Sequence, residues 1–309
     1  MRENPAIVRS DLEKRGDVGK MKLFEELIQL DADARQLQVQ VEGLRHRRNV
    51  VSEEIASLAR AGKKADEKRR EAEALPVRIK DLQASLDERQ GRIRQILMGI
   101  PNILHESVPV GKDDTENREV RRWGEPRQFD FQLVPHGELM ETLGVGDFAR
   151  AAKASGAGFV YLIGKLAILD QALIRFAIDI LVAKGFTLVE PPLMLRREAY
   201  EGVVDLADFE TMMYQVSDTD LYMIATSEHP IVAMHMDEIL DGDDLPIRYV
   251  GLSTNFRKEI GSKGVDTKGL FRMHQFNKVE QVIFCRPEDS WTLHEELIGN
   301  AEAIFQALE

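Results

Sequence analysis

The sequence predicts an α+β protein, in which a long antiparallel α-helical coiled-coil hairpin precedes an antiparallel β-sheet domain flanked by helices. Three observations support this. Apolar residues recur in heptads through residues 23 to 100, a segment rich in Pro, Gly and Asn follows, and short β-rich segments then alternate with helical ones. With 309 residues, 43% of them hydrophobic, the chain can bury a core in about two domains. We assign the helical arm to residues 1 to 103, a linker to 104 to 135 and the sheet domain to 136 to 309.

The arm is predicted from two runs of apolar residues, called seams here, that have the same heptad spacing. The first seam is Leu23, Leu27, Leu30, Ala34, Leu37, Val41, Leu44, Val51, Ile55 and Leu58, with Arg48 at the one polar position. The second seam is Ala65, Ala72, Leu75, Ile79, Leu82, Leu86, Ile93, Ile96 and Ile100. Spacings that alternate between four and three residues are typical of a coiled coil. Because the turn-forming sequence AGKK at 61 to 64 separates the seams, we expect one antiparallel hairpin of two equal helices, each of roughly 36 residues and about 54 Å.

One proline and one glycine disturb the helical pattern. Pro76 is expected to kink or interrupt the second helix, because proline lacks the N–H group and clashes with the preceding turn. Gly43 is expected to weaken the first helix by up to about 1 kcal/mol relative to alanine. Neither residue changes the prediction of a hairpin.

Charge is distributed unevenly along the chain. The net charge of −12 argues against a surface that binds nucleic acid broadly. Residues 41 to 80, however, hold eleven Lys or Arg against seven Asp or Glu, so this window is about +4 and the remainder about −16. The basic cluster comprises Arg45, Arg47, Arg48, Lys63, Lys64, Lys68, Arg69 and Arg70. A nucleic-acid backbone is one candidate partner, but a solvated coiled-coil face has the same pattern, and no aromatic residue interleaves the cluster.

Cysteine usage and hydropathy restrict the compartment. The single cysteine, Cys285, excludes a disulfide framework and a Cys-rich zinc site, and we expect it to be a buried strand residue. No apolar run reaches the roughly 18 residues of a membrane helix, and the charged N-terminus lacks the apolar region of a signal peptide. We therefore expect a cytoplasmic protein with no membrane partner and no zinc.

The sheet domain is outlined by helical and β-rich segments. We expect short helices within 136 to 153, a long helix at about 165 to 184, and strands at 186 to 189, 222 to 225, 247 to 256, 271 to 275 and 279 to 285. Gly185 ends the long helix, and Pro191 and Pro192 follow the first strand. No Gly-rich dinucleotide or phosphate loop occurs in the sequence.

One segment concentrates charged and aromatic residues, STNFRKEIGSKGVDTKGLFRMHQFNKVEQVIF, which reads as strand, loop and strand. Positions that differ by even numbers share a strand face, which groups Arg257 with Glu259, and Arg272 with Phe276 and Glu280. Two arginines, two carboxylates and an aromatic ring predict a site for phosphate oxygens, a base and an amine. A structural salt-bridge ladder would explain the charges but would give the ring no role.

Several motifs are similar to those of class II aminoacyl-tRNA synthetases. FRKE, a loop and FRMHQF resemble motif 2, and GFTLVEPP resembles motif 1, whose proline is best matched by Pro192. Other segments resemble the seryl enzymes in particular. They are DTKG, HQFNKVEQ, Thr226-Ser227-Glu228, the opening MRENPAIVRSDLEKRGD, IPNILHESVPVG with WGEP, and PHGELMETLG. The resemblance spans residues 1 to 309 and identifies the chain as a member of the seryl-tRNA synthetase family.

The resemblance implies roles for the matching residues. Arg257 would contact the ATP α-phosphate and the serine carboxylate, and Arg272 the γ-phosphate, which makes these two the catalytic residues. The ATP-binding residues would be Arg257, Lys258, Glu259, Arg272, Met273 and Phe276, with Glu259 reading adenine and Phe276 stacking on it. The serine-binding residues would be Thr226, Ser227, Glu228, Arg257 and Glu280. From the residues alone, Thr226 to Glu228 are typical of a helix N-cap before Pro230.

The activity that the resemblance implies is that of a serine–tRNA ligase. The serine carboxylate would attack the α-phosphorus of Mg²⁺-ATP, and seryl-adenylate would then serylate tRNA(Ser) and, where it is present, the selenocysteine tRNA. Catalysis would depend on alignment and on the positive charge of arginine and Mg²⁺. By the same resemblance the basic arm grips the long variable arm of tRNA(Ser), Pro192 lies at a homodimer interface, and DNA is not a partner.

The chain departs from the family pattern at its C-terminal end. Family members continue past Glu309 with magnesium ligands, part of the serine pocket and motif 3, so we expect a C-terminally truncated catalytic domain with no metal ligands of its own. Two alternatives remain open. One is a shortened relative that binds tRNA or a partner without catalysis. The other is a synthetase-like ligase that loads amino acids on carrier proteins, which would need a Cys ligand set that one cysteine does not supply.

Overall fold

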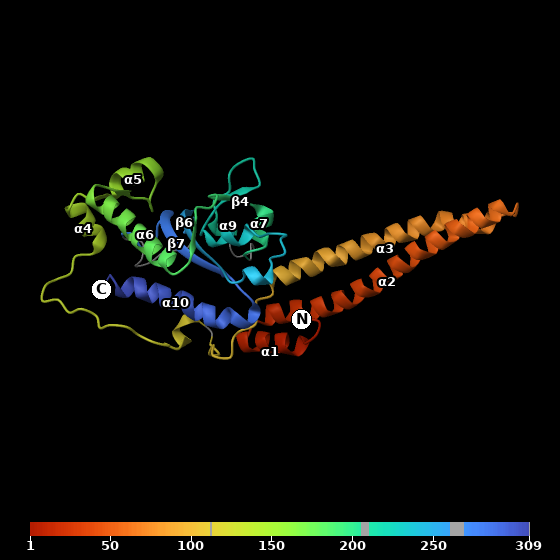
Figure 1. Cartoon of the computed structure of the whole chain (residues 1–309), viewed down its shortest axis with the longest axis horizontal. Coiled ribbons are helices and arrows are strands. Elements are labelled where there is room, and N and C mark those ends of the chain that lie inside the picture. Colours follow the sequence, from red (N-terminus) through yellow and green to blue (C-terminus); the bar gives the residue numbers. More distant parts are fainter. Residues whose placement is uncertain (112, 205–209, 260–268, 309) are drawn as a thin grey trace. The chain divides into compact units, whose positions relative to one another are not determined.

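The computed structural model describes residues 1–111, 113–204, 210–259 and 269–308, which form two compact units, Met1–Glu125 and Pro126–Glu309 (Figure 1). The first unit is helical, and the second combines small sheets with helices. This confirms the predicted α+β class. The predicted loop after Glu259, with most of its DTKG element, lies outside the described residues.

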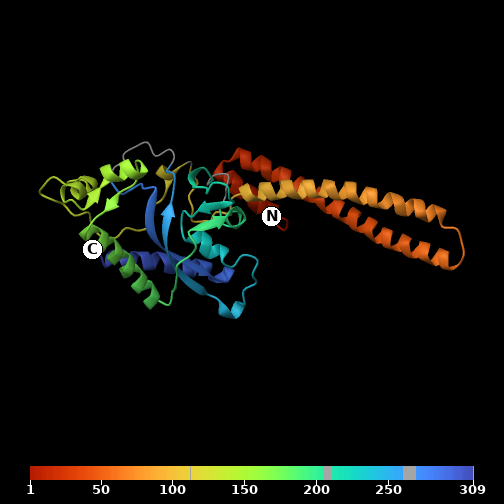
Figure 2. The same ribbon diagram turned by 90° about the horizontal axis from the view of Figure 1, so that it is seen from above.

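The first unit contains the predicted antiparallel hairpin. Its helices α2 (Val18–Arg60) and α3 (Asp66–Gly99) lie side by side, as the two views of Figures 1 and 2 show. Most of the buried arm positions belong to the predicted seams: Leu27, Ala34, Val41, Val51, Leu75, Leu86 and Ile96. The helices are unequal, with 43 and 34 residues, so the prediction of equal lengths is wrong. The sequence analysis also missed α1 (Pro5–Arg15), which contacts α2.

The tip and the proline of the arm can be compared with their predictions. The chain reverses after Arg60, where Gly62 adopts a φ of 65° that glycine reaches without a Cβ penalty. Ala65, assigned to the second seam, is the residue that precedes α3. The helix runs without interruption through Pro76, so a break there is the wrong expectation. The free energy lost with the missing hydrogen bond is smaller than the free energy gained when α3 packs its apolar residues along α2. Leu75, beside the proline, is buried in this contact.

The base of the arm has a core of its own. Val8 and Leu12 of α1 pack with Phe24 and Leu27 of α2 and with Ile96 of α3. Phe24 is fully buried there. This core joins α1 to the hairpin.

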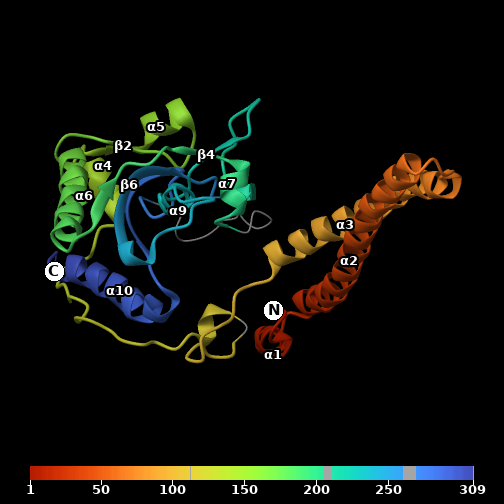
Figure 3. The same ribbon diagram turned by 45° about the vertical axis from the view of Figure 1, so that its right-hand side comes forward.

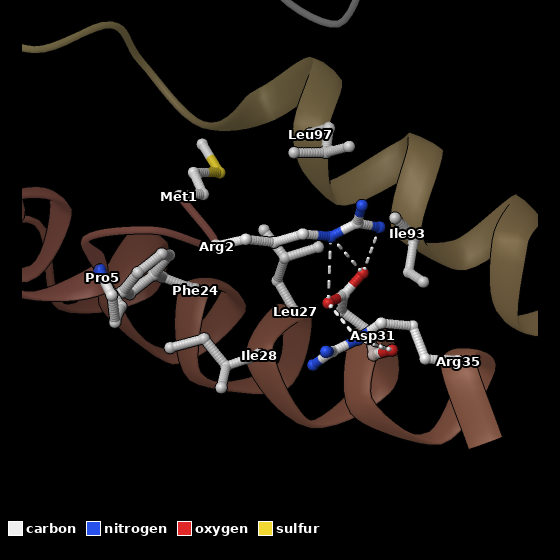
Figure 4. Close-up of a pocket in the computed structure, with 10 residues that line it drawn as sticks. All are labelled: Met1, Arg2, Pro5, Phe24, Leu27, Ile28, Asp31, Arg35, Ile93 and Leu97. Carbon is white, nitrogen blue, oxygen red and sulfur yellow. Dashed lines mark hydrogen bonds and ion pairs between the residues drawn. The ribbon is translucent and has the colours of Figure 1, made fainter.

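A cavity of about 430 Å³ lies beside this core. Figure 4 shows the guanidinium groups of Arg2 and Arg35 directed at the carboxylate of Asp31 on its wall. Arg2 donates to Asp31 at 2.6 Å, and the Arg35 ion pair measures 3.2 Å. These contacts tie the first residues of the chain to α2.

The central sheet of the second unit has the described strand order β3–β6–β7, with β3 (Thr187–Val189), β6 (Ile247–Phe256) and β7 (Gln275–Phe284). The last two pair antiparallel over ten residues, from Ile247 opposite Phe284 to Phe256 opposite Gln275. The predicted antiparallel pairing is present between β6 and β7, while β3 adds a parallel pairing to β6 that the sequence analysis did not anticipate. The chain between β3 and β6 is long enough for the crossover that parallel pairing requires. In place of the two strands predicted at 271 to 275 and 279 to 285 there is one strand, β7, which begins only at Gln275, so a strand over 271 to 274 is the wrong expectation.

The two faces of this sheet are covered differently. On one face, Val250 packs with Leu181 of α6 (Lys165–Ala183), and Leu297 of α10 (Ser290–Gln306) joins them. On the other, α9 (Glu228–Ala233) contacts β6 and β7, and Figure 3 shows it across the sheet from α6. Gly251 permits this close approach, because a Cβ there would lie 2.6 Å from the Ser227 hydroxyl oxygen. One face is therefore an apolar core, and the other is left for polar groups.

Shorter elements complete the second unit. They are α4 (His136–Thr142), β1 (Gly146–Asp147), α5 (Phe148–Ser155), β2 (Tyr161–Leu162), β4 (Met194–Arg196), α7 (Arg197–Glu201) and β5 (Leu221–Met223). Strands β1 and β2 form one small antiparallel sheet, and β4 and β5 another. Cys285 follows β7 and is half-buried. Among the described helices, none has the length and apolar character that crossing a membrane requires.

Phe24 is expected to dominate the stability of the arm base. Phe24→Ala should lower the free energy of unfolding by about 3–5 kcal/mol, because it opens a cavity at a fully buried position. Val39, on the same helix, is 70% exposed, so Val39→Ala is the matched control and should change the free energy of unfolding little. Thermal melting followed by the helical circular-dichroism signal measures both. Equal losses in the two variants would contradict the assignment of this core.

His229 predicts an acid-sensitive second unit. The residue is 3% exposed, and its ring packs on Tyr200. Burial, with smaller contributions from Lys278 and Arg257, lowers its pKa from 6.5 to about 4. Between these two pKa values the His229 side chain is protonated in the unfolded chain but not in the folded one. The free energy of unfolding should therefore fall, by up to about 3 kcal/mol, as the pH drops from about 7 to about 4. His229→Gln should flatten this dependence in chemical denaturation curves. The exposed His294→Gln should not, and a similar flattening by both would reject the explanation.

Candidate functional site

A cavity of about 450 Å³ lies where the β6–β7 ladder ends. Its lining residues are Arg257, Glu259, Leu270, Phe271, Arg272, Met273 and Phe276. Five of the six predicted ATP-binding residues are thus brought together from the two sides of the loop. Leu270 and Phe271 also line the cavity and were not predicted.

Arg257 lies directly beyond the end of β6. Its guanidinium carbon is 5.2 Å from the ring centroid of Phe276, within the range of a cation–π contact. Its Nε and Nη2 both donate to the carbonyl oxygen of Ala225 at 3.3 Å. The aromatic face and one carbonyl therefore hold the guanidinium, and the partners leave some of its N–H groups available to a ligand.

Glu259 and Arg272 form an ion pair across the same cavity, with 3.0 Å between Nη1 and Oε2. Glu259 has a φ of 48°, an uncommon backbone conformation outside glycine. The Arg272 side chain is 49% exposed, so its charge faces solvent and the cavity. Both residues, like Arg257, lie outside the strands, so the expectation that strand alternation orients them is wrong. It holds for Phe276 and Glu280 of β7.

His274 fixes the backbone beneath this cavity. Its Nδ1 donates to the Arg257 carbonyl oxygen at 2.9 Å and lies 2.7 Å from the Tyr214 hydroxyl, while its ring stacks on Phe159. The Arg257 N–H donates in return to the His274 carbonyl oxygen at 3.0 Å. Lys258 points elsewhere, with its Nζ 5.8 Å from the Tyr214 ring, so this predicted ATP-binding residue does not line the cavity.

His136 of α4 supports the opposite wall. Its Nε2 accepts a hydrogen bond of 2.7 Å from the Leu270 N–H, and its ring meets the Phe271 ring edge-on at 4.7 Å. Gly137 allows this approach, because a Cβ there would lie 3.1 Å from the Gly269 Cα. A residue from the PHGELMETLG motif therefore positions the chain that carries Arg272.

A second polar cluster lies further along the same face of β7. The Thr226 hydroxyl donates to Glu280 Oε2 at 2.9 Å, and Lys278 Nζ donates to the Thr226 oxygen at 3.1 Å and pairs with Glu280. Thr226 is 5% exposed. Since Arg257 is bonded to Ala225, the residue before Thr226, this cluster and the cavity are neighbours. Two predicted serine-binding residues, Thr226 and Glu280, are in direct contact.

The other residues of the predicted serine loop lie differently. Ser227 is fully buried under Gly251, and its hydroxyl oxygen has no hydrogen-bond partner among the described residues. Glu228 is exposed at the start of α9. The Thr226 oxygen accepts from the Glu228 N–H at 3.3 Å, so part of the N-cap geometry of the sequence analysis is present as well.

The basic cluster of the arm divides into two groups. Arg47 and Lys68 belong to a cross-helix network with Glu54 and Glu71, in which Arg47 bonds Glu71 at 2.6 Å and Lys68 bonds Glu54 at 2.7 Å. Arg45 donates to Gln83. The remaining five are exposed and have no ion pair within the described chain: Arg48, Lys63, Lys64, Arg69 and Arg70. These five exposed cations offer positive charge that no carboxylate of the described chain neutralises.

Pro192 lines a different cavity, of about 530 Å³, between β4 and α9. Met194, Ile231 and Met234 are among its apolar wall residues. Among the described residues, no group of three or more His, Cys, Asp or Glu side chains is arranged to hold a metal ion.

Sequence reasoning missed Lys278 and His274. Lys278 carried a usable signal, because it lies midway between Phe276 and Glu280 and alternation places all three on one face. His274 carried none, since its role depends on partners from residues 158 to 159 and 214, distant in the sequence.

Comparison with known proteins identifies the family of the chain. Residues 1–104 match the seryl-tRNA synthetase N-terminal domain, and residues 210–309 match the class II tRNA synthetase core domain (G, H, P, S and T). The whole chain is 53% identical to the serine–tRNA ligase of Methanocella arvoryzae and 55% identical to that of Methanoregula boonei, and it spans 72% of the length of each.

Solved structures give the same result. The seryl-tRNA synthetase of Pyrococcus horikoshii complexed with ATP is 46% identical, with a TM-score of 0.91 over 99% of this chain and 73% of that one. The cytoplasmic serine–tRNA ligase of Naegleria fowleri in complex with AMP is 32% identical, with a TM-score of 0.84 over 99% of this chain and 70% of that one. At this identity and coverage, the chain belongs to the seryl-tRNA synthetase family.

Proposed function

We propose that this chain carries the ATP-binding and amino-acid-activating face and the tRNA-binding arm of a serine–tRNA ligase. The observation that supports this best is the cavity in which Arg257, Glu259, Arg272 and Phe276 meet. It combines two guanidinium groups, one carboxylate and one aromatic ring, which is a chemistry suited to a purine nucleotide. Relatives over the full length of the chain are named as serine–tRNA ligases, and one related structure holds ATP.

The nucleotide would lie between the aromatic and the charged groups of the cavity. Phe276 offers a ring for the adenine, while Arg257 behind it and the half-exposed Arg272 offer donors for phosphate oxygens. The Glu259 carboxylate can accept a hydrogen bond from the adenine amino group, and Met273 adds an apolar wall. Lys258, which points to Tyr214, supports the fold of this motif without contacting the nucleotide.

Serine would bind beside the nucleotide, at the cluster of Thr226, Lys278 and Glu280. Glu280 is an acceptor for the amino acid's ammonium or hydroxyl, and Arg257 lies between this cluster and the nucleotide cavity. The serine carboxylate would therefore reach the α-phosphorus next to the Arg257 guanidinium. The bond from this carboxylate oxygen to phosphorus forms as the bond to the pyrophosphate oxygen breaks, which yields seryl-adenylate.

The protein's contribution to this step is positioning and charge. The guanidinium groups of Arg257 and Arg272 stabilise negative charge on the phosphates, and no side chain acts as a nucleophile. Magnesium stays a prediction: the described cavity residues supply one carboxylate, Glu259, which is already ion-paired, so we assign no step to the metal.

The exposed cations at the arm tip are suited to a phosphate backbone. Arg48, Lys63, Lys64, Arg69 and Arg70 have long side chains and no ion pair with a described residue, so they can neutralise phosphates at little cost. We assign the long variable arm of tRNA(Ser) as their partner. Serylation of a selenocysteine tRNA would use the same contacts. Homodimerisation through the Pro192 region and a cytoplasmic location belong to the same proposal.

Arg257→Ala should abolish activation of serine in the protein that the whole gene encodes. Serine-dependent exchange of pyrophosphate into ATP should fall by roughly 10²- to 10³-fold, because one preorganised donor to the reacting phosphate is lost. Arg175→Ala, on the surface of α6 with its charge paired to Asp179, is the matched control. Near-normal exchange by Arg257→Ala would overturn the phosphate assignment, and no exchange by the unaltered protein would favour a non-catalytic relative.

Replacing unpaired cations near the arm tip should weaken the aminoacylation of tRNA without changing the activation of serine. The variant replaces four cations by glutamine: Lys63, Lys64, Arg69 and Arg70. Its KM for tRNA in aminoacylation should rise at least about tenfold, and the dependence of tRNA affinity on log salt should flatten by roughly 0.7–0.9 per lost contact, while pyrophosphate exchange is unchanged. The control removes Lys14 and Lys22 at the arm base. Unchanged tRNA affinity in the tip variant would mean that the tip does not bind tRNA.

A further inference from the structure

Lys278 lies on the charged face of β7, between Phe276 and Glu280, in the cluster assigned to serine but with no role of its own so far. Its Nζ pairs with the Glu280 carboxylate and donates to the Thr226 hydroxyl oxygen at 3.1 Å. The side chain is one-third exposed. One ammonium group therefore joins two residues that belong to different elements, β7 and the segment before α9.

These bonds use the full capacity of the Thr226 hydroxyl. A hydroxyl has one donor and two acceptor sites. The donor is given to Glu280 at 2.9 Å, and the acceptors receive Lys278 at 3.1 Å and the Glu228 N–H at 3.3 Å. An incoming amino acid would therefore have to displace one of these partners before it could bond the Thr226 hydroxyl. This hydroxyl orients the Glu280 carboxylate.

Glu280 is left with one available oxygen. Both Thr226 and Lys278 bond to Oε2, whereas Oε1 has no partner among the described residues. Two bonds to one oxygen restrict the rotamer of the carboxylate and leave its other oxygen available to a ligand. An ammonium has three donors, so Lys278 keeps one N–H beyond its two partners. The open groups of the cluster are thus one acceptor and one adjacent donor.

The surroundings keep this cluster electrostatically polarised. Lys278 bonds Thr226 and Arg257 bonds the carbonyl oxygen of the preceding Ala225, so the two cations lie around the same small volume. Both lower the pKa of the buried His229, after the larger effect of its burial. The histidine remains neutral there near pH 7 and adds no third charge. Without Lys278, the Glu280 carboxylate would lose its ion pair on the protein and could turn to Arg257.

We propose that Lys278 is a positioning residue for the amino acid, which holds Glu280 and Thr226 so that Glu280 Oε1 alone accepts from the substrate. This inference rests on the proposed function, since it assigns serine to the cluster. It predicts an effect on the binding of serine with little effect on ATP, because Phe276 and Arg257 hold the nucleotide side.

The experiment is steady-state pyrophosphate exchange by the whole-gene protein carrying Lys278→Met or Lys278→Arg. Lys278→Met should raise the KM for serine by at least about tenfold and leave the KM for ATP within about twofold. Lys278→Arg, which keeps a charge and donors, should recover most of the loss. Arg248→Met is the matched control, because it removes a half-buried cation, paired with Glu296, from the opposite face of the same sheet. It should leave both KM values unchanged.

A double-mutant comparison separates positioning from general damage. If Lys278 acts through Glu280, then Lys278→Met combined with Glu280→Gln should cost no more than Glu280→Gln alone. Fully additive losses would overturn the inference, as would equal rises in both KM values, an unchanged KM for serine, or a Lys278→Arg variant as impaired as Lys278→Met. An ATP KM near that of the unaltered protein shows that a variant is folded. Absence of exchange in the unaltered protein would instead reject the proposed function itself.

Discussion

The ten-residue antiparallel pairing of β6 and β7 is the constraint on which the second unit depends. Because Phe256 lies opposite Gln275, the chain leaves β6 and enters β7 at one point, where Arg257 and His274 exchange two hydrogen bonds. The same register assigns every residue of β7 to one of two faces. A shift of the pairing by one residue would turn Phe276, Lys278 and Glu280 into the apolar core. Fold and site are therefore fixed by a single ladder.

The charged face is stable because most of its ions have partners within the protein. Removing an isolated charge from water costs several kcal/mol, so even a partly buried cluster is favoured when its charges have ion pairs and hydrogen bonds. Lys278 has Glu280, Arg272 has Glu259, and Arg257 has a carbonyl oxygen and an aromatic ring. Each of the last two keeps some donors unused. The face is thus held together by contacts that still leave room for an anion.

Much of this could be predicted from the sequence, and what failed has a common cause. Heptad spacing predicted the hairpin, and the family motifs selected the residues that meet in the cavity. The alternation of strand faces, however, was applied to residues outside the strands, because Arg257 and Arg272 lie just beyond the strand ends. The hydrogen bonds of the ladder decide where a strand stops, and the sequence pattern does not show them. The parallel pairing of β3 is a tertiary property that no local pattern contains. The interruption expected at Pro76 does not occur, because the local cost of a proline carries no information about the partner helix.

The arm shows how one pattern of charge can serve two purposes. Arg47 and Lys68 form ion pairs with Glu54 and Glu71 that join the two helices. Because each positive charge has a negative partner, these residues add little to the electrostatic potential at a distance. The exposed cations near the turn have no such partners in the described chain, so the positive potential of the arm is concentrated at its tip. A phosphate backbone would meet this potential first, and the apolar seam beneath, with Val51 and Leu75 buried, would keep the tip rigid. The bridged cations set the geometry of the hairpin, and the unbridged ones are left to bind.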